Sequence, residues 1–208
     1  MHDLIIVRHG EATHLTDALT GGWTDSRLTE RGKRQAKRTA DRLAELLAGR
    51  PFRFYSSDLR RAVETARVIE QRLGVPPTFA GELRELNLGI VANMTIEEAR
   101  RHERPITRPV LDWVPFPGAE SWRQMWQRVC GFLDGVARDA DTVLAITHGL
   151  IAGAIVHWWL DLGEAAWEKV DFALDPCAIT HLTMNQWGQR TILKLNDTAH
   201  LSALSAGE

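Results

Sequence analysis

The sequence has few of the features that would place a protein outside the cell or in a membrane. Only two of its 208 residues are cysteines, and Cys130 and Cys177 lie far apart and form no CxxC pair. Neither a disulfide framework nor a zinc site is therefore expected. The longest apolar run of the second half, residues 149–160, is too short to cross a bilayer, and the first residues lack the basic lead and apolar stretch of a signal peptide. We expect a cytoplasmic protein.

The chain also lacks a strong net charge. Its formal charge of −2 at pH 7 gives no overall attraction to nucleic acid or to an anionic membrane, so neither is expected as a partner. Any bound anion must instead meet a local group of positive side chains. The balance of 44% hydrophobic and 25% charged residues is that of an ordinary globular protein with a proper core.

Short apolar runs alternate with helical patterns along the chain. The continuous runs at 4–7 and 143–146 are typical of strands buried on both faces. Further strands are expected at 53–56, 178–184 and 191–195. Helices are expected at about 29–47, 58–73, 96–102, 120–137 and 150–160.

This alternation predicts an α/β fold, a three-layer α/β/α sandwich with a mainly parallel central sheet. We expect a single domain over residues 1–208, with an irregular segment at about 86–120. In such sheets, ligands bind at the carboxyl ends of the strands.

Histidines and arginines gather at those predicted strand ends. The three ends read RHGE at 8–11, SSDLRR at 56–61 and THG at 147–149. Arginine offers a donor fork that matches phosphate oxygens, and histidine can act as nucleophile or proton carrier near neutral pH. Gly10 and Gly149, each directly after a histidine, would let the backbone turn and approach a ligand closely.

His9 is the candidate nucleophile, because neighbouring arginine charges should keep its imidazole neutral. An acid is needed for the leaving oxygen, and Glu85 is the candidate, although Glu82 competes with it on spacing alone. Arg60 similarly competes with Arg61 as the phosphate ligand, since neighbours on a helix face different ways.

Three further histidines and the tryptophans are expected to have structural roles. A lone histidine in a core is usually hydrogen-bonded to its surroundings, and we apply this interpretation to His102, His157 and His181. Trp113 and Trp122 are more often core residues than a platform for a substrate.

Seven stretches of the sequence, taken in order along the chain, resemble the motifs of one protein family. They are LIIVRHGE (4–11), GGWTDSRLTERGKRQA (21–36), YSSDLRRAVETA (55–66), LRELNLG (83–89), PFPGAES (115–121), ITHG (146–149) and NDTAHL (196–201). Together they resemble the histidine phosphatase superfamily, the phosphoglycerate mutase-like fold, over nearly the whole chain.

The resemblance implies roles for particular residues. His9 would become transiently phosphorylated, and Arg8, Arg61 and His148 would bind the transferred phosphoryl group. The family pattern thereby selects Arg61 rather than Arg60.

The same resemblance selects Glu85 rather than Glu82 as the proton donor, and it implies backbone contacts to the substrate near Gly22. No cofactor and no metal are implied. The expected partner is a small phosphorylated substrate.

Two stretches depart from the family pattern. The family often has an asparagine where this chain has Leu15, which removes a usual phosphate contact. Either Thr13 or His14 would supply this phosphate contact instead, or phosphate would bind more weakly. After Gly89 the family often has an acidic-Trp-acidic-Gly stretch, but IVAN follows here at 90–93. This difference affects the expected substrate, which the segment at 86–120 would select.

The leading interpretation is a phosphomonoesterase that hydrolyses a small phosphorylated metabolite through a phosphohistidine on His9. The alternative within the superfamily is a cofactor-dependent phosphoglycerate mutase. That branch generally has a longer insertion after the acid segment, so the modest connection here favours the phosphatase. The mutase is favoured by GGWTD at 21–25 and by arginines that could bind a substrate carboxylate, namely Arg100, Arg101, Arg104 and Arg108.

Two other classes are less favoured. A metal-dependent hydrolase could use His9, His148 and Glu85 as ligands, but Arg8 and Arg61 would repel a cation. A non-catalytic module that binds a phosphorylated ligand would keep the arginines but would not need both a nucleophile and an acid.

Overall fold

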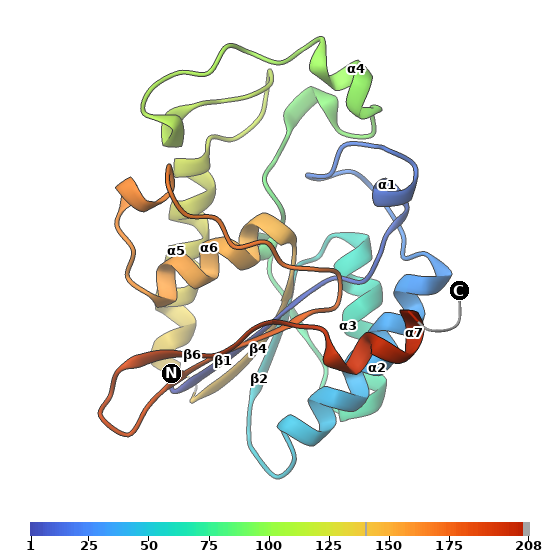
Figure 1. Cartoon of the computed structure of the whole chain (residues 1–208), viewed down its shortest axis with the longest axis vertical. Coiled ribbons are helices and arrows are strands. Elements are labelled where there is room, and N and C mark those ends of the chain that lie inside the picture. The colour runs from blue at the N-terminus through green and yellow to red at the C-terminus, as the bar shows by residue number, and fades with distance from the viewer. Residues whose placement is uncertain (140, 206–208) are drawn as a thin grey trace.

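The computed structural model describes residues 1–139 and 141–205, and these form one six-stranded sheet with helices on both faces (Figure 1). The strand order is β3-β2-β4-β1-β5-β6. The first four strands in this order run parallel to one another, whereas β5 pairs antiparallel with both β1 and β6. The strands are β1 (Asp3–Arg8), β2 (Arg53–Ser56), β3 (Thr78–Phe79), β4 (Thr142–Thr147), β5 (Ile179–Met184) and β6 (Arg190–Asp197).

Two long helices cover each face of the sheet. α2 and α3 lie on one side, and α5 and α6 lie on the other (Figure 1). The α-helices are α1 (Thr13–Thr16), α2 (Glu30–Leu46), α3 (Arg60–Leu73), α4 (Ile96–Arg100), α5 (Trp122–Asp139), α6 (Gly149–Trp159) and α7 (Ser202–Ser205). Short 3-10 turns are η1 (Gly81–Leu83), η2 (Gly89–Val91), η3 (Val110–Asp112), η4 (Glu164–Ala166) and η5 (Ala199–Leu201).

The continuous apolar run of β1 is explained by helices on both faces. Ile5 and Val7 pack into the hydrophobic cluster beneath α2 and α3. Leu4 and Ile6 point the other way, into the cluster beneath α5 and α6. Since successive side chains of a strand alternate between faces, a strand covered on both sides needs apolar residues throughout.

α2 shows why local signals are sufficient to predict the long helices. Its N-cap, Thr29, accepts a hydrogen bond from the Gly32 amide through Oγ1 at 3.0 Å, which satisfies one of the free amides of the first turn. Ala36, Ala40 and Leu43 form its buried stripe. The predicted helix therefore occurs where capping and periodicity place it.

The predicted three-layer α/β/α fold is confirmed, with some differences in short elements. The pairing of β3 through only Thr78 and Phe79 was not predicted, and neither was the four-residue helix α1, because neither is long enough to show a periodicity. α3 begins at Arg60 rather than at 58. Among the described residues, no helix combines the length and the apolar character needed to span a membrane.

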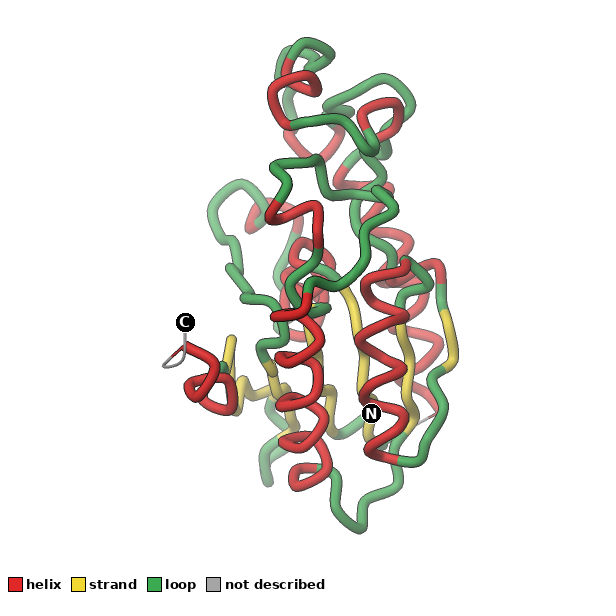
Figure 2. Tube along the Cα trace, turned by 90° about the vertical axis from the view of Figure 1, so that its right-hand side faces the viewer, coloured by secondary structure: helices red, strands yellow, loops and turns green. Residues whose placement is uncertain are grey.

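The segment at 86–120, which contains η2, α4 and η3, projects beyond one end of the sheet (Figure 2). It contacts the loop after β1, where the Thr20 amide donates to the Met94 carbonyl at 2.9 Å and the Ile96 amide donates to the Ala18 carbonyl at 3.0 Å. The projecting segment and this loop therefore stand together above the carboxyl ends of the parallel strands (Figure 1).

Candidate active site

Sheet register brings the two predicted histidines side by side. The parallel pairing of β1 with β4 aligns Arg8 with Thr147, so the next residue of each strand, His9 or His148, occupies a neighbouring position. The His9 amide donates to the Thr147 carbonyl at 2.8 Å, and the two imidazole centroids lie 5.1 Å apart. Ser57 follows the adjacent strand β2, and the register places it beside Thr147, one residue before His148. The carboxyl ends of three parallel strands thus build one site.

The hydrogen bonds of His9 define which ring nitrogen carries its proton. Nδ1 lies 2.7 Å from the Gly10 carbonyl oxygen, which can only accept, so Nδ1 bears the hydrogen and Nε2 keeps its lone pair. Arg61 Nε donates to that lone pair at 3.1 Å. Burial, followed by the charges of Arg61 and Arg8, lowers the pKa of His9 well below its ordinary value. His9 is therefore a neutral imidazole at pH 7.

Arg61 is fully buried, and backbone oxygens anchor its guanidinium. Nη2 donates to the Gly22 carbonyl at 2.7 Å, and Nη1 donates to the Thr24 carbonyl at 3.0 Å. Burial lowers the pKa of Arg61 to about 10, against the opposing effect of Glu85, so the group keeps its charge at neutral pH. Its neighbour Arg60 is exposed and bonds to Glu64 at 2.9 Å. Of the two arginines, only Arg61 therefore reaches His9.

His148 and Arg8 each hold a buried nitrogen without a hydrogen-bond partner. The Ser57 hydroxyl accepts from the Leu59 amide at 3.2 Å and lies 2.8 Å from His148 Nε2. The hydroxyl hydrogen is thus available for Nε2, which leaves the proton of His148 on the unpartnered Nδ1. Arg8 Nη1 donates to the Leu174 carbonyl at 2.6 Å, but its Nε is buried and unpartnered. Unpaired buried donors are costly, and they commonly mark sites that receive a ligand.

Glu85 is held next to these cations by backbone amides. Its Oε1 accepts from the Leu86 amide at 2.9 Å, and its Oε2 accepts from the Leu150 amide in the first turn of α6 at 3.2 Å. Its negative charge raises the pKa values of Arg8 and Arg61 against the larger effect of burial, so the carboxylate lies near both. The alternative acid, Glu82, has an exposed side chain.

Glycine is required at Gly22 by its backbone angles. Its φ is +59°, and a Cβ would lie 2.8 Å from the Leu86 carbonyl oxygen, so no other residue fits without strain. The sequence predicts that Gly10 lets the backbone approach a ligand closely, but the structure shows a different reason for glycine at this position. A Cβ there would lie 2.7 Å from the Gly32 carbonyl oxygen, so Gly10 lets the first turn of α2 pack against the loop after β1.

All six site residues named from the sequence lie around one point. They are Arg8, His9, Gly22, Arg61, Glu85 and His148. Sequence reasoning assigned no role to Ser57, although it follows a strand as the two histidines do and could have been found by the same rule. His14, which the sequence offered together with Thr13 as a replacement for the asparagine contact, follows no strand, and its ring centroid lies 5.7 Å from that of His9.

The other histidines fit their expected structural roles with one exception. His157 pairs with the Val170 carbonyl at 3.2 Å and stacks on Trp167. His181 bonds to Asp3 at 2.8 Å. The expectation was wrong for His102, which is exposed just after α4, because the segment around it has no layer above it to form a core.

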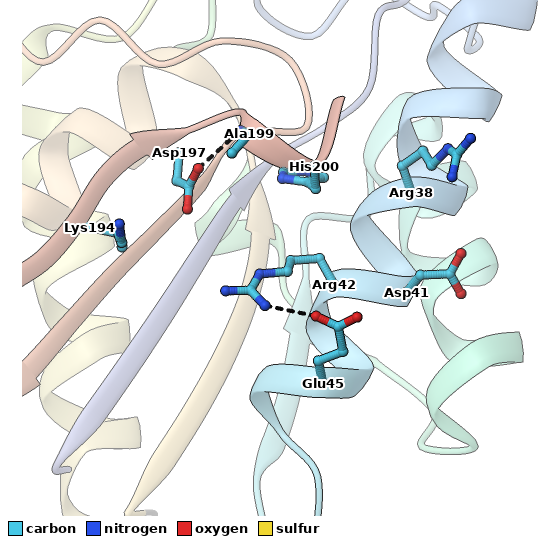
Figure 3. A pocket seen from close by; sticks show the side chains of 8 residues that line it. All are labelled: Arg38, Asp41, Arg42, Glu45, Lys194, Asp197, Ala199 and His200. Atoms are coloured by element: carbon cyan, nitrogen blue, oxygen red, sulfur yellow. Dashed lines mark hydrogen bonds and ion pairs between the residues drawn. The ribbon is translucent and has the colours of Figure 1, made fainter. Parts of the chain in front are cut away.

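A separate cavity of about 480 Å³ opens beside α2 and β6 (Figure 3). It contains none of the six site residues. Its charged lining is balanced in sign and is made of Arg38, Asp41, Arg42, Glu45, Lys194 and Asp197. Arg42 and Glu45 bond to one another at 2.7 Å, so this cavity does not concentrate positive charge as the strand ends do.

Comparison with known proteins shows the family of the chain. Residues 4–198 match the sequence family described as histidine phosphatase superfamily (branch 1). The chain belongs to this superfamily.

Full-length relatives bear more than one functional name. The chain is 29% identical over 217 residues to a protein named probable phosphoglycerate mutase GpmB from Salmonella paratyphi C, covering 100% of this chain and 99% of that relative. Among solved structures, a mycobacterial glucosyl-3-phosphoglycerate phosphatase in complex with VO3 has a TM-score of 0.80 at 24% identity, covering 95% of this chain and 100% of that one. The alpha-ribazole phosphatase from Shigella flexneri has a TM-score of 0.77 at 23% identity, with 94% and 96% coverage. These two structures show a shared fold.

Proposed function

We propose that this protein is a phosphomonoesterase that hydrolyses a small phosphorylated metabolite in the cytoplasm through a phosphohistidine at Nε2 of His9. The observation that carries the proposal is the neutral His9, whose Nε2 lone pair lies beside Arg61 while its Nδ1 hydrogen is held by the Gly10 carbonyl. A nucleophile with a free electron pair thus lies beside buried hydrogen-bond donors that can bind an anion.

In the first half of the reaction, Arg8, Arg61 and His148 bind the non-bridging phosphoryl oxygens. Arg8 Nε and His148 Nδ1, which are unpartnered without substrate, each donate to one of them. Arg61 Nε transfers its hydrogen bond from His9 to the phosphoryl group. The Nε2 lone pair then forms a bond to phosphorus, the bond to the leaving oxygen breaks, and protonated Glu85 gives that oxygen its proton.

In the second half, Glu85 is a carboxylate and acts as a base. It takes a proton from a water molecule whose oxygen attacks phosphorus on the side that the leaving group vacated. The phosphorus–nitrogen bond breaks, its electron pair returns to Nε2, and inorganic phosphate leaves. The Gly10 carbonyl stabilises the intermediate, because it accepts a hydrogen bond from Nδ1 while the ring carries positive charge.

A phosphoglycerate mutase is the second candidate, and the name of the full-length Salmonella relative favours it. The two activities share the phosphohistidine and differ in the acceptor, which is water in one case and a substrate hydroxyl in the other. Both phosphoglycerates should therefore be included in a turnover screen of phosphorylated metabolites. Release of inorganic phosphate supports the phosphatase, whereas interconversion of the two without release supports the mutase.

The covalent step is tested by brief incubation with ³²P-labelled nitrophenyl phosphate, followed by denaturation. We expect an adduct that is labile in acid and stable in base and that maps to His9. His9→Ala should remove the label, with circular dichroism used to show that the variant folds. Label retained in folded His9→Ala would contradict the proposed nucleophile.

The same incubation with a chelator tests the expectation of a metal-free site. Labelling and turnover should be unchanged, because Arg8 and Arg61 would repel a cation from the phosphoryl position. Loss of labelling that a divalent ion restores would refute the mechanism.

A further inference from the structure

The loop after β1 shows how this site differs from the usual family pattern. Leu15 stands where the family often has an asparagine, but its side chain is 43% exposed and lies on the outside of α1. Thr13 is half-buried, and its amide is bonded to the Arg27 carbonyl at 2.9 Å. His14 is the residue of α1 that turns inward, with only 5% of its surface exposed.

We propose that His14 is a third imidazole of the phosphoryl site and donates a hydrogen bond from Nε2 to a non-bridging phosphoryl oxygen. This inference rests on the proposed function. His14 would replace the contact that the family's asparagine makes. It stands one position earlier in the sequence than Leu15, and its donor is an imidazole N–H.

Geometry and charge both place His14 among the groups at the strand ends. Its ring centroid lies 5.7 Å from that of His9, at an interplanar angle of 57°. Burial, followed by the charges of Arg61 and Arg8, lowers the pKa of His14 to about 4. His14 in turn contributes to the lowered pKa of His148. The ring of His14 therefore lies close to His9 and within the electrostatic field of both arginines.

Hydrogen bonds around Ser26 allow Nε2 of His14 to be the donor. Arg61 Nη1 donates to Ser26 Oγ at 3.4 Å, and His14 Nδ1 lies 2.9 Å from the same oxygen. With one lone pair turned to Arg61, the Ser26 hydroxyl can give its hydrogen to Nδ1. The proton of neutral His14 then sits on Nε2.

The second ring nitrogen of His14, Nε2, lies near the loop at Gly21 and Gly22. Within residues 1–139 and 141–205, it has no hydrogen-bond partner. Its edge faces Gly21, where even an added Cβ would stay 4.0 Å from Nε2 and 3.8 Å from Cδ2. Gly21 precedes Gly22, whose carbonyl anchors Arg61. Nε2 therefore lies beside the glycine pair whose second carbonyl also holds Arg61.

Binding of inorganic phosphate and of orthovanadate, measured by calorimetry, tests this role independently of turnover. His14→Phe keeps the ring shape but has no donor, so both anions should bind about 10- to 100-fold more weakly, as expected for one lost hydrogen bond to a charged group. His14→Gln, which can place an amide donor near the position of Nε2, should stay within a few-fold of the parent. Leu15→Ala, on the exposed side of α1, is the matched control and should not change binding.

Nuclear magnetic resonance of the parent protein covers the case in which His14→Phe fails to fold. The ¹⁵Nε2 signal of His14, assigned by its absence in His14→Gln, should shift when phosphate is added. The inference is overturned if folded His14→Phe binds phosphate within two-fold of the parent, if the His14 signal does not respond, or if the parent binds neither anion.

These outcomes separate the inference from the proposed function. If the parent forms phosphohistidine while His14→Phe binds phosphate normally, the role of His14 fails alone. If the parent forms no phosphohistidine but His14→Phe weakens phosphate binding, the proposed reaction fails, and the binding role of His14 stands.

Discussion

The strand-end residues and the projecting segment at 86–120 are held in place by different forces. At the strand ends, sheet hydrogen bonds place His9 and His148, and the buried side chains bond to one another or to backbone, as Arg61 does. The projecting segment buries a few side chains, such as Val91 and Leu111, and otherwise makes contacts nearer the surface, such as the ion pair of Arg123 with Asp112 and the stacking of Trp113 on Trp122 at 5.3 Å. Chemistry that needs fixed atoms is thus built on the sheet, whereas the part expected to select the substrate lies on a less constrained surface.

The two regions meet at a half-buried ion pair. Arg128 of α5 bonds to Glu120 at 2.6 Å and donates to the backbone carbonyls of Glu82 and Arg84 at 2.5 and 2.9 Å. Glu120 also accepts from the Asn87 amide at 2.9 Å. The stretch that carries Glu85 is therefore tied to α5 just before the projecting segment begins.

Among substitutions that leave the nucleophile His9 in place, the largest effect is expected for Glu85. Glu85→Gln keeps the shape but cannot supply a proton, so alkyl phosphate hydrolysis should fall by about 10²–10⁴-fold, the usual contribution of general acid catalysis. Formation of phosphohistidine from nitrophenyl phosphate, whose leaving group hardly needs a proton, should fall far less. Rapid-quench rates on both substrates measure this. Equal losses would mean that Glu85 only supports the pocket, and Glu82 or Glu120 would then be tested as the acid.

Arg61 and its neighbour Arg60 lie on the same helix, but the charge of Arg61 is buried and that of Arg60 is exposed. Arg61→Ala removes a preorganised donor, and such removals commonly cost about 10²–10³-fold in rate. Arg60→Ala removes an exposed partner of Glu64 and should leave turnover within a few-fold of the parent. Steady-state rates of the two variants test this difference. If Arg60→Ala lost more activity than Arg61→Ala, Arg61 would not be the phosphoryl ligand.

A smaller effect is expected where the two regions meet. Arg128→Ala leaves Glu120 and the backbone carbonyls of Glu82, Arg84 and Glu85 without their charged donor, which should lower the free energy of unfolding by about 1.5–3 kcal/mol. Arg123→Ala on the same helix removes exposed ion pairs with Asp112 and Glu164 and should change stability little. Urea unfolding of both variants tests the difference. Equal changes would show that the Arg128 contacts are no stronger than those at the surface.

A pH dependence of stability is expected to originate at the strand ends. The pKa values of His9 and His148 are lowered in the folded state, first by burial, so below pH 6.5 the unfolded chain takes up protons that the folded chain does not. Their contribution is complete above pH 6.5, and it falls by about 1.4 kcal/mol per pH unit for each histidine as the pH decreases. Urea unfolding between pH 7.5 and 5.5 measures the slope. His148→Gln should reduce that slope, and an unchanged slope would contradict a neutral buried His148.

Much of the fold could be predicted because its signals are local. The apolar runs of β1 and β4, the cap at Thr29 and the periodic stripe of α2 all depend on neighbours a few residues away. Together with the rule that ligands bind at the carboxyl ends of parallel strands, these signals are sufficient to place His9 and His148 in a common site. β3 and α1 were missed because two and four residues carry no periodicity.

The sequence by itself determined which chemical groups stand at the strand ends, since strand limits and residue types are written in short stretches of chain. Only the tertiary structure decided how those groups are oriented. Spacing left Arg60 and Arg61 open, and the packing of α3 against the loop at Gly22 turns one inward and the other to solvent. The protonated nitrogen of His9, the support of His148 by Ser57 and the inward turn of His14 all depend on atoms that are distant in sequence. Hydrogen bonds act over about 3 Å, so only the folded chain brings these partners within reach.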